Sequence, residues 1–503
     1  MNPPPAATTP GNAGWDWERV FPAALAILIG VAAITAQSFW IDEAATGKIA
    51  VQSTLAGWWQ AMLDDPGSTT HMPLYTIYTW SWEKIFGHNE WWLRLSNLPW
   101  LALGLLAIPR RQTAFLLLVG CSPFVWFYLN EFRPYVMQTS VSLLLLGVLW
   151  QLAGTSSKPG QPGMREWILM GFFCFGLVAL SSSSLLGMIW AGAACATVLI
   201  VLGWPRSLRL ARQNALVLAI TSLALITLAG YYLWALKRGK GVTPGSNGIG
   251  NTLFAFYELF GFAGLGPGRT QIREIGLSSF RPFVIPLALQ TVVTSFVFFA
   301  GCKRVMQQTP RRVWLGVAVT LGATVIFFLA AGELKHFRVL GRHFAPLAPV
   351  LVLLLAIGFR SLWSRAGWRR WLATFFVLFS LASAVSLRFA GRHAKDDYRT
   401  AAAIAITANA NNEKVWWCAD ESTGLYYRVP LSPREGLPAP GQVWLASHPP
   451  AQLLTNQPPP DLLILSKPYL HDNDGLMRSY LANHHYVMLQ KLPAFTVWCK
   501  TAE

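Results

Sequence analysis

Charged residues are scarce in this sequence of 503 residues. Only 13% of the residues are charged and 53% are hydrophobic, whereas about 25% are charged in ordinary soluble domains. This composition excludes a typical soluble multidomain enzyme and favours a polytopic membrane protein. Acidic residues are the scarcer kind, with 23 Asp and Glu against 40 Lys and Arg. Because the basic residues are spread between apolar segments and form no single patch, their excess does not predict nucleic-acid binding.

Cysteine is also rare, and its spacing excludes the common metal motifs. The six cysteines form no CxxC pair, and no His/Cys spacing typical of a zinc site occurs. Four of them lie in or beside apolar segments, where we expect them to pack as small apolar side chains. Cys418 and Cys499 differ, because both end predicted strands in the C-terminal part of the chain. In an oxidising compartment these two either stay free or form a disulfide.

Long apolar runs, in contrast, are abundant. Residues 21–40 contain no charge before Ile41, and about twenty such residues are enough to cross a bilayer. The preceding residues 1–20 hold one Arg and no Lys, so we interpret them as a cytoplasmic tail before a retained first span and not as a secretory signal. The pattern predicts about eleven spans, at 21–40, 91–109, 112–129, 135–152, 166–183, 184–203, 214–234, 283–301, 313–331, 346–360 and 371–389.

The positions of Lys and Arg predict the orientation of these spans. Alternate short loops carry basic residues and almost no acid, as at Arg110-Arg111 and Arg311-Arg312, and such loops are cytoplasmic under the positive-inside rule. The N-terminus is then inside and the C-terminus outside. We therefore predict a transmembrane domain over 21–390, with outer loops 41–90 and 237–282.

Residues 391–503 contain no run long enough to span a membrane and are richer in Asp, Asn, His and Pro. Short apolar runs at 415–418 and 462–465 predict strands, and residues 401–410 and 474–483 predict helices. We expect a small α/β domain outside the membrane.

The pair Asp42-Glu43 comes directly after the first apolar segment. A carboxylate pair at that place either caps a helix or acts as a reactive group at the lipid surface. The rest of loop 41–90 is rich in Trp and Tyr, which prefer the headgroup level, and contains His71 and Tyr75. Two interfacial helices in this loop would place Asp42, Glu43 and His71 at one depth, facing the membrane-embedded core.

Two further clusters combine charged and aromatic residues beside predicted spans. One contains Glu131, Arg133 and Tyr135, and the other contains Lys335, Arg342 and His343. Ionisable groups near membrane depth are functional hypotheses by default, although an ion pair at a helix end or an Arg reaching to headgroups would give the same pattern. Loop 237–282 adds further cations, and the simplest partner for them is an anion such as a lipid phosphate: these cations are Lys237, Arg238, Lys240, Arg269, Arg273 and Arg281.

Taken in order, these motifs resemble the C-type superfamily of membrane glycosyltransferases, in the branch of protein O-mannosyltransferases and lipid A aminoarabinose transferases. Met72 stands where the family usually has the first Pro of His-Pro-Pro, and His343 stands where Tyr is common; both departures concern the substrate more than the fold. The motifs are Asp42-Glu43, His71-Met72-Pro73-Leu74-Tyr75, Arg94-Leu95, Ser122-Pro123, Glu131-Phe132-Arg133-Pro134-Tyr135, Gly341-Arg342-His343-Phe344 and Lys395-Asp396-Asp397-Tyr398-Arg399.

The resemblance implies transfer of a sugar, with inversion, from a polyprenyl-phosphate donor to a protein, lipid or glycan acceptor. The reaction would take place at the outer face of a bacterial cytoplasmic membrane, among membrane lipids and without nucleic acid. Asp42 would be the base, with Glu43 as its neighbour or as a substrate or metal contact. No cofactor is implied with certainty, and a divalent cation near Asp42 and Glu43 stays open. The remaining expected residues are Arg342, Lys335, Arg133 and His343 for the donor phosphate, and His71, Tyr75, Glu131 and Tyr135 for substrate.

Two other classes of function remain open at this stage. A transporter or flippase for lipid-linked glycans would need a polar route through the bilayer, but charges within the predicted spans are nearly absent. A structural member of the family would use its C-terminal domain to bind a partner without catalysis. Replacing Asp42 with Asn distinguishes the enzyme from both alternatives.

Overall fold

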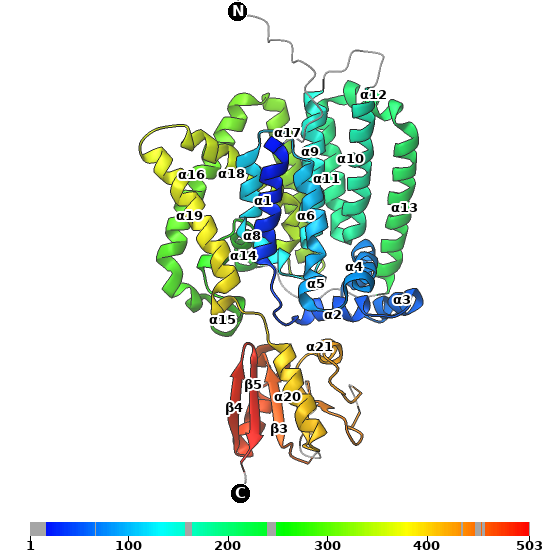
Figure 1. Ribbon diagram of the computed structural model, residues 1–503, viewed down its shortest axis with the longest axis vertical. Coiled ribbons are helices and arrows are strands. Elements are labelled where there is room, and N and C mark those ends of the chain that lie inside the picture. The colour runs from blue at the N-terminus through cyan, green and yellow to red at the C-terminus, as the bar shows by residue number, and fades with distance from the viewer. Residues whose placement is uncertain are drawn as a thin grey trace, which may run out of the picture.

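The computed structural model describes residues 17–65, 67–155, 163–238, 248–433, 436–447, 454 and 458–501. The molecule consists of a helical bundle and a small domain with a β-sheet at one end of it (Figure 1). Most of the expected cytoplasmic tail, and the loop cation Lys240, lie outside the described residues.

The bundle contains eight helical segments, within the described ranges, that are long and apolar enough to cross a membrane. They agree with eight of the predicted spans, and the break predicted between 183 and 184 is present because Ser184 caps the second helix with a side chain that accepts from Gly187 N. They are built on α9 (Tyr135–Gly154), α10 (Met164–Ser183), α11 (Leu185–Leu202), α13 (Ala215–Lys237), α16 (Val284–Gln308), α17 (Arg311–Leu334), α18 (Ala348–Trp363) and α19 (Trp368–Phe389).

The other three predicted spans differ from single long helices. The span predicted at 21–40 is α1, which ends at Ala33, and residues 34–40 are extended. The span predicted at 91–109 is divided into two helices at Ser96, and the span predicted at 112–129 is divided at Cys121 and Ser122. The last break has a local cause, since Pro123 has no backbone N–H and therefore starts a new helix. The shorter helices are α1 (Trp17–Ala33), α5 (Glu90–Leu95), α6 (Asn97–Leu106), α7 (Thr113–Gly120) and α8 (Pro123–Leu129).

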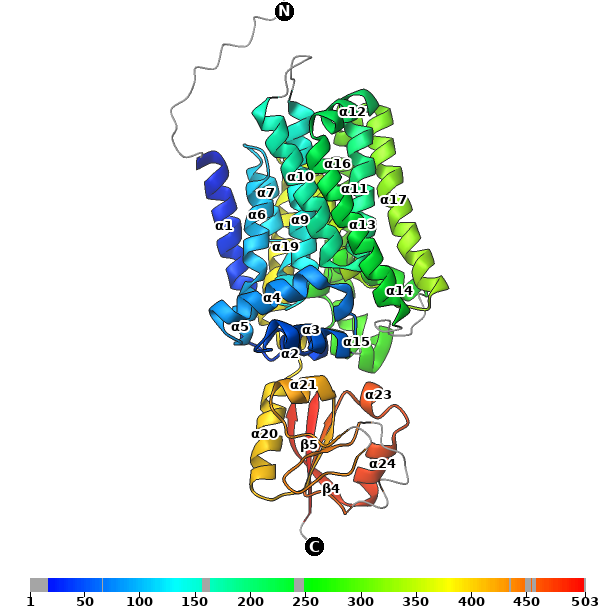
Figure 2. The ribbon, with the colours of Figure 1, turned by 90° about the vertical axis from the view of Figure 1, so that its right-hand side faces the viewer.

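Short helices cover the end of the bundle that faces the C-terminal domain. α2 (Ile41–Ala50), α3 (Leu55–Asp64) and α4 (Pro73–Phe86) lie there, at an angle to the long helices (Figure 2). The prediction of two helices in loop 41–90 is wrong in number: the loop holds three α-helices and the short η1 (Thr69–His71). The first predicted helix is divided into α2 and α3, because the Thr54 side chain accepts from Gly57 N and caps a new helix. Other segments complete this end: α14 (Ile249–Leu259), η2 (Ala263–Leu265), α15 (Arg269–Ile275), η3 (Gly276–Phe283), η4 (Gly341–Leu347) and η5 (Gly391–His393). On the opposite side of the bundle, α12 (Trp204–Gln213) joins α11 to α13.

The C-terminal domain has a five-stranded sheet in the order β2-β1-β3-β5-β4. The two strands predicted from apolar runs, β1 and β3, are parallel neighbours at the centre and are completely buried, as expected for strands covered on both faces. The predicted helices are present too, as α20 and α24. The elements are α20 (Tyr398–Ala410), β1 (Val415–Cys418), α21 (Glu421–Tyr426), β2 (Trp444–Leu445), β3 (Leu462–Ser466), α23 (Pro468–His471), α24 (Leu476–Asn483), β4 (Tyr486–Leu492) and β5 (Phe495–Lys500).

The sheet order explains why Cys418 and Cys499 do not form a disulfide. Both are free thiols. Cys418 lies beside Leu465 and Cys499 beside Leu462, so β3 separates the two cysteines and they stand at opposite ends of that strand. Their positions at strand ends, which suggested a pair, leave them too far apart to be bridged.

Candidate functional site

The extended segment 34–40 delivers two acidic side chains to different environments. α2 begins at Ile41, so Asp42 and Glu43 occupy its first turn, where the helix dipole favours negative charge. The Glu43 side chain is fully buried, whereas the Asp42 side chain is 32% exposed. The two adjacent carboxylates therefore have different surroundings and different partners.

Glu43 is held on every side by donors. Arg94 donates from Nε to Oε1 at 2.9 Å and from Nη2 to Oε2 at 3.0 Å, and this guanidinium also donates to the carbonyls of Thr35 and Gln37. The backbone N–H of Phe132 donates to Oε1 at 2.7 Å, and Lys395 Nζ lies 2.6 Å from Oε2. Burial alone would raise the pKa of Glu43, but the charges of Arg94 and Lys395 hold it below its usual value. Glu43 thus fixes the segment that carries Asp42.

Asp42 is the accessible carboxylate of the pair. Its Oδ2 accepts from Arg342 Nη1 at 2.9 Å. Arg133 Nη1 donates to the Asp42 carbonyl at 3.2 Å and to Thr46 Oγ1 at 2.9 Å. Burial raises the pKa of Asp42, yet Arg342 and Arg133 outweigh that effect and the pKa is lowered overall. Asp42 is therefore an ionised, partly exposed carboxylate at neutral pH, which is the state a general base requires.

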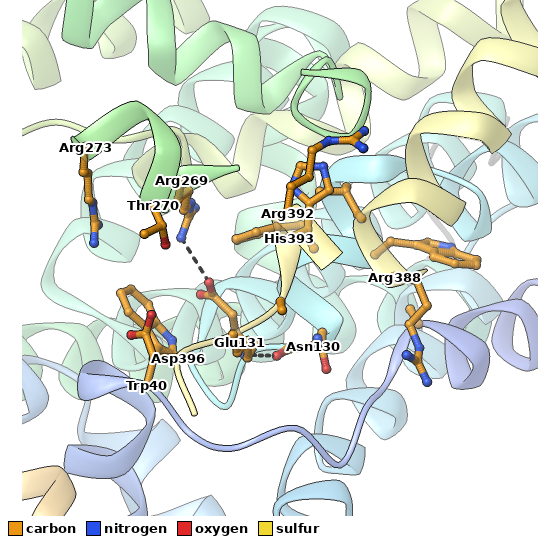
Figure 3. Close-up of a pocket in the computed structure, with 16 residues that line it drawn as sticks. Trp40, Asn130, Glu131, Arg269, Thr270, Arg273, Arg388, Arg392, His393 and Asp396 are labelled. Atoms are coloured by element: carbon orange, nitrogen blue, oxygen red, sulfur yellow. Dashed lines mark hydrogen bonds and ion pairs between the residues drawn. The ribbon is translucent and has the colours of Figure 1, made fainter. Parts of the chain in front are cut away.

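A cationic pocket adjoins this segment. It has a cavity volume of about 90 Å³ and lies between the ends of α8, α15 and α19 and the linker to the C-terminal domain. Trp126, Phe127 and Leu387 give it apolar walls. Its polar lining is mostly cationic: Arg269, Arg273, Arg388, Arg392 and Lys395 line it together with Glu131 and Asp396, and Figure 3 shows the four arginines. His393 also lines the pocket, but burial lowers its pKa to about 4, so this side chain is neutral at pH 7. Such a site suits an amphiphilic anion.

Glu131 and Arg269 form the polar centre of the pocket. Arg269 Nη1 lies 3.3 Å from Glu131 Oε1, as Figure 3 shows, and Nη2 lies 2.6 Å from Glu258 Oε1. Glu131 is 2% exposed, and its other oxygen, Oε2, has no hydrogen-bond partner in the part of the chain that the structure describes. Burial raises the pKa of Glu131, against the lowering effect of Arg269 and Lys395. An unpartnered buried oxygen beside a cavity is typical of a place where a ligand or water completes the hydrogen bonding.

Comparison with solved structures identifies the architecture. ArnT from Cupriavidus metallidurans in the apo state matches with a TM-score of 0.51 and 13% identity, over 96% of this chain and 98% of that one. The chain has the fold of the C-type glycosyltransferases. The same enzyme bound to undecaprenyl phosphate gives a TM-score of 0.48, with 14% identity over 96% of this chain and 98% of that one. Arabinofuranosyltransferase AftD from Mycobacteria gives 0.46, with 14% identity over 98% of this chain and only 40% of its own.

No protein-family model matches the sequence, and no curated protein matches it either. The solved structures nevertheless confirm, at the level of the fold, the resemblance predicted from the ordered motifs. The chain is a multi-pass membrane protein. The count of eleven spans, the inside–outside orientation and the roles of single residues stay predictions.

Within this glycosyltransferase fold, four of the predicted residues come together. Asp42, Arg133 and Arg342 form one charged group, and the guanidinium carbon of Arg342 lies 5.5 Å from the centre of the Tyr135 ring. Glu131 belongs to the neighbouring pocket. These residues come from α2, from the turn between α8 and α9 together with the first residue of α9, and from η4, three segments that are far apart in sequence.

The other predicted residues are differently placed. Tyr75 is fully buried and His71 is 7% exposed, and neither the Tyr75 hydroxyl nor His71 Nε2 has a hydrogen-bond partner among the described residues. His343 uses Nδ1 to accept from Leu340 N at 3.1 Å, which fixes the turn of η4. Lys335 is exposed at the C-terminal end of α17, and no contact links it to Asp42 in the described part of the chain.

A divalent cation is not favoured by these surroundings. Both oxygens of Glu43 accept from cations, and Asp42 Oδ2 is paired with Arg342. The described residues contain no group of three or more His, Cys, Asp or Glu placed to hold a metal ion. The donor set therefore does not fit a divalent cation, which prefers several free oxygen ligands.

Sequence analysis missed the residues that hold the site together. Arg94 and Lys395 were part of recognised motifs but received no role, and Arg269 was grouped with other loop cations. Arg94 and Lys395 both pair with Glu43, which is 51 and 352 residues away in sequence, and Arg269 pairs with Glu131, which is 138 residues away. One signal was available in the sequence. Ionisable residues at membrane depth usually pair with one another, and Glu43 and Glu131 were the acids predicted at the same membrane depth as these cations.

Proposed function

We propose that this protein transfers a glycosyl group from a polyprenyl-phosphate donor to an acceptor hydroxyl, with Asp42 as the general base. The observation that carries the proposal is the place of Asp42: an ionised, partly exposed carboxylate on a short segment that also contributes to the wall of a cationic pocket. Trp40, two residues before Asp42, lines that pocket. The base and the anion site are thus built on the same short segment, in a fold that is shared with glycosyltransferases.

The chemistry needs one base and no matching acid. Asp42 accepts the proton of the acceptor hydroxyl while the hydroxyl oxygen forms a bond to the anomeric carbon. The bond from that carbon to the phosphate oxygen breaks, and the polyprenyl phosphate leaves with the electron pair. Because the leaving group is a stable anion, protonation is unnecessary, unlike in glycosidases with paired acids. Direct displacement inverts the configuration at the anomeric carbon.

The pocket cations stabilise the phosphate in this proposal. Arg269 and Arg392 place guanidinium groups at the pocket, and such groups suit phosphate oxygens. In the structure Arg269 pairs with Glu131 and Glu258, and Arg392 donates to the carbonyls of Gly264 and Gly266, so the phosphate would share or replace these contacts. Phe127 and Leu387 offer apolar surface to the lipid chain. Arg342 forms an ion pair with Asp42, and its charge also acts on Glu131 in the pocket. Of the donor-phosphate residues expected from sequence, Arg342 keeps this role in the proposal. Arg133 is buried and donates to the Asp42 carbonyl, Thr46 and Ser68, so in the proposal it supports α2 instead.

The direct test uses purified protein in lipid nanodiscs with radiolabelled polyprenyl-phosphate hexoses and pentoses, and a membrane extract as acceptor source. Transfer of label to the acceptor, with an inverted product linkage, supports the proposal. Movement of donor across the bilayer of proteoliposomes without transfer would replace it with the flippase function, and binding without either activity would replace it with a structural role.

Arg269 provides a prediction about the donor. Arg269→Lys keeps the positive charge but loses the planar fork, so we expect the KM for the donor and the Kd for undecaprenyl phosphate to rise about tenfold or more, with kcat changed less. Arg281→Lys is the matched control, because Arg281 is an exposed cation of the same loop. Equal effects of the two substitutions would contradict a phosphate site at Arg269.

Arg342 provides a prediction about pH. Arg342 is the main cause of the lowered pKa of Asp42, while burial acts in the opposite direction. Arg342→Met removes the lowering charge and leaves the burial, so the pKa of Asp42 rises. The base must be deprotonated to act; hence the acid limb of the pH profile of kcat should move to higher pH in the variant. An acid limb that stays in place would show that Asp42 is not the titrating base.

A further inference from the structure

The C-terminal domain contacts the segment that carries Asp42 through four residues, here called the domain junction: Lys395, Arg399, Tyr426 and Tyr427. Tyr427 Oη accepts from Phe39 N at 2.7 Å. Arg399 N donates to Ser38 Oγ at 3.0 Å. The C-terminal domain thus binds directly to the extended segment 34–40 that precedes Asp42.

The fit between α21 and α2 is equally close. Tyr426 packs against Phe39, with ring centres 5.3 Å apart, and a Cβ added at Gly47 of α2 would lie 2.7 Å from the Tyr426 ring. A side chain at position 47 would therefore push α21 away from α2. Because close-packed contacts are hardly compressible, a displacement of α21 would be transmitted to α2.

Lys395 is the residue of the domain junction that reaches furthest into the site. It stands between η5 and α20 with its side chain 12% exposed. Its Nζ is 2.6 Å from Glu43 Oε2, and it also donates to the carbonyl of Asn130. Both Lys395 and Asn130 line the cationic pocket. One ammonium group therefore joins three parts: the linker to the C-terminal domain, the helix of Asp42 and the wall of the pocket.

We propose that Lys395 is a positioning residue for Asp42, through which the C-terminal domain sets the distance between the base and the donor pocket. The inference rests on the proposed function, since it assigns a role within that reaction. Lys395 does not touch the reacting atoms: its partners are the buried Glu43 and the Asn130 carbonyl. Its effect is on geometry, and an error of about 1 Å in the placing of a catalytic group costs about 10²-fold in rate.

The charges around Lys395 make this role sensitive to pH. Three charged groups act on it directly: Glu43 on α2, Arg94 on α5 and Glu131 after α8. The pocket around it also contains Asp396 in the linker, the cations Arg269 and Arg392, and the neutral His393. Burial and the charge of Arg94 lower the pKa of Lys395 to about 8, although Glu43 and Glu131 act to raise it. The ammonium that holds Glu43 is therefore lost in mildly alkaline solution, and the bond to the carboxylate loses its charge assistance.

This titration separates activity from stability. Lys395 releases its proton more readily in the folded chain than in the unfolded chain, so the unfolded state binds more protons between pH 8 and the ordinary pKa of Lys near 10.4. Under linkage, this titration increases the free energy of unfolding as the pH rises. Loss of activity above pH 8 from this cause is then not accompanied by unfolding.

The test compares wild type, Lys395→Arg and Lys395→Met in nanodiscs, with the exposed Lys414→Met as control. Transfer from polyprenyl-phosphate sugars is measured between pH 6 and pH 10. We expect Lys395→Met to lower kcat about 10- to 100-fold, with the donor KM changed by less than about threefold. We expect Lys395→Arg, which stays charged, to keep most of the activity at pH 7 and to retain it above pH 8, where the wild-type rate falls. Wild-type kcat and an unchanged alkaline limb in both variants would overturn the proposal.

A second measurement is independent of turnover. Hydrogen exchange of the backbone amides of residues 38–46 is followed at pH 7 in the same proteins, and we expect it to be about tenfold faster in Lys395→Met than in wild type, Lys395→Arg or Lys414→Met. If this difference appears but no donor supports transfer by wild type, the positioning of the segment stands and the proposed function fails. If wild type transfers sugar but the exchange and the kinetics of both Lys395 variants match it, the proposed function stands and the role of Lys395 fails.

Discussion

Asp42→Asn should lower the rate of glycosyl transfer by about 10²- to 10⁴-fold, the range that a general base contributes. The amide keeps the size of the side chain and can still accept from Arg342, so the fold and the binding of undecaprenyl phosphate should remain. The loss should appear in kcat, because the removed group acts on the acceptor proton in the transition state and not on the bound donor. The measurement is kcat and KM with radiolabelled donor, together with direct binding of undecaprenyl phosphate.

The matched control for this substitution is Asp64→Asn. Asp64 is an exposed acid on α3, and its carboxylate accepts only from Gln60 among the described residues. We expect wild-type kinetics from it. If Asp42→Asn also turns over at the wild-type rate, the base lies elsewhere, and Glu131 becomes the candidate because its buried Oε2 has no hydrogen-bond partner among the described residues. Glu43 is a poorer candidate, since Arg94, Lys395 and Phe132 occupy its oxygens.

Arg94→Met should destabilise the protein by about 3–5 kcal/mol, the cost of leaving one partner of a buried ion pair without the other. Arg94 and Glu43 are both completely buried. Methionine fills much of the volume, but it leaves the Glu43 carboxylate with fewer donors and leaves the carbonyls of Thr35 and Gln37 without the guanidinium. The unfolding midpoint, followed by size-exclusion chromatography after heating in detergent, should fall strongly.

Lys84→Met is the control for this second substitution. Lys84 pairs with Glu83 at 2.5 Å, but its side chain is 34% exposed, and exposed ion pairs contribute about 0–1 kcal/mol. A comparable fall in the unfolding midpoint for both variants would show that the buried ion pair of Arg94 and Glu43 contributes no more to stability than an exposed pair. Restoration of the midpoint in the double variant Arg94→Met, Glu43→Met would attribute the loss to the unpaired carboxylate itself.

Hydropathy predicted the long helices well because their signal is local. Where a capping residue or a proline bounds a run of apolar residues, the local sequence marks the ends of the helix. The break before Leu185, for example, follows from Ser184 alone. The same signal failed at α7 and α8, where one apolar stretch contains two helices. Ser122 accepts from Val125 N and Pro123 starts the second helix, so the pair Ser-Pro was the available marker of that break.

The candidate site was predicted only in part, because its contacts are long-range. Asp42 was recognisable from its place after an apolar segment, and Arg342 from its place between two spans, but the ion pair joins residues 300 positions apart. The different surroundings of Asp42, which is partly exposed, and Glu43, which is buried, were not predictable from two adjacent acidic residues in the sequence. They depend on Arg94 and Lys395, which reach Glu43 from another helix and another domain.

The domain junction has a consequence for how the protein matures. Its contacts join residues 36–43, made early during synthesis, to Lys395, Arg399 and Tyr427 near the other end of the chain. Since chains fold progressively from the N-terminus as they are made, the segment bearing Asp42 must wait for the last quarter of the polypeptide before its contacts are complete. A truncated or half-inserted product would then carry Asp42, the proposed base, without the contacts that position it. The order of synthesis itself would keep incomplete copies from consuming the lipid-linked donor.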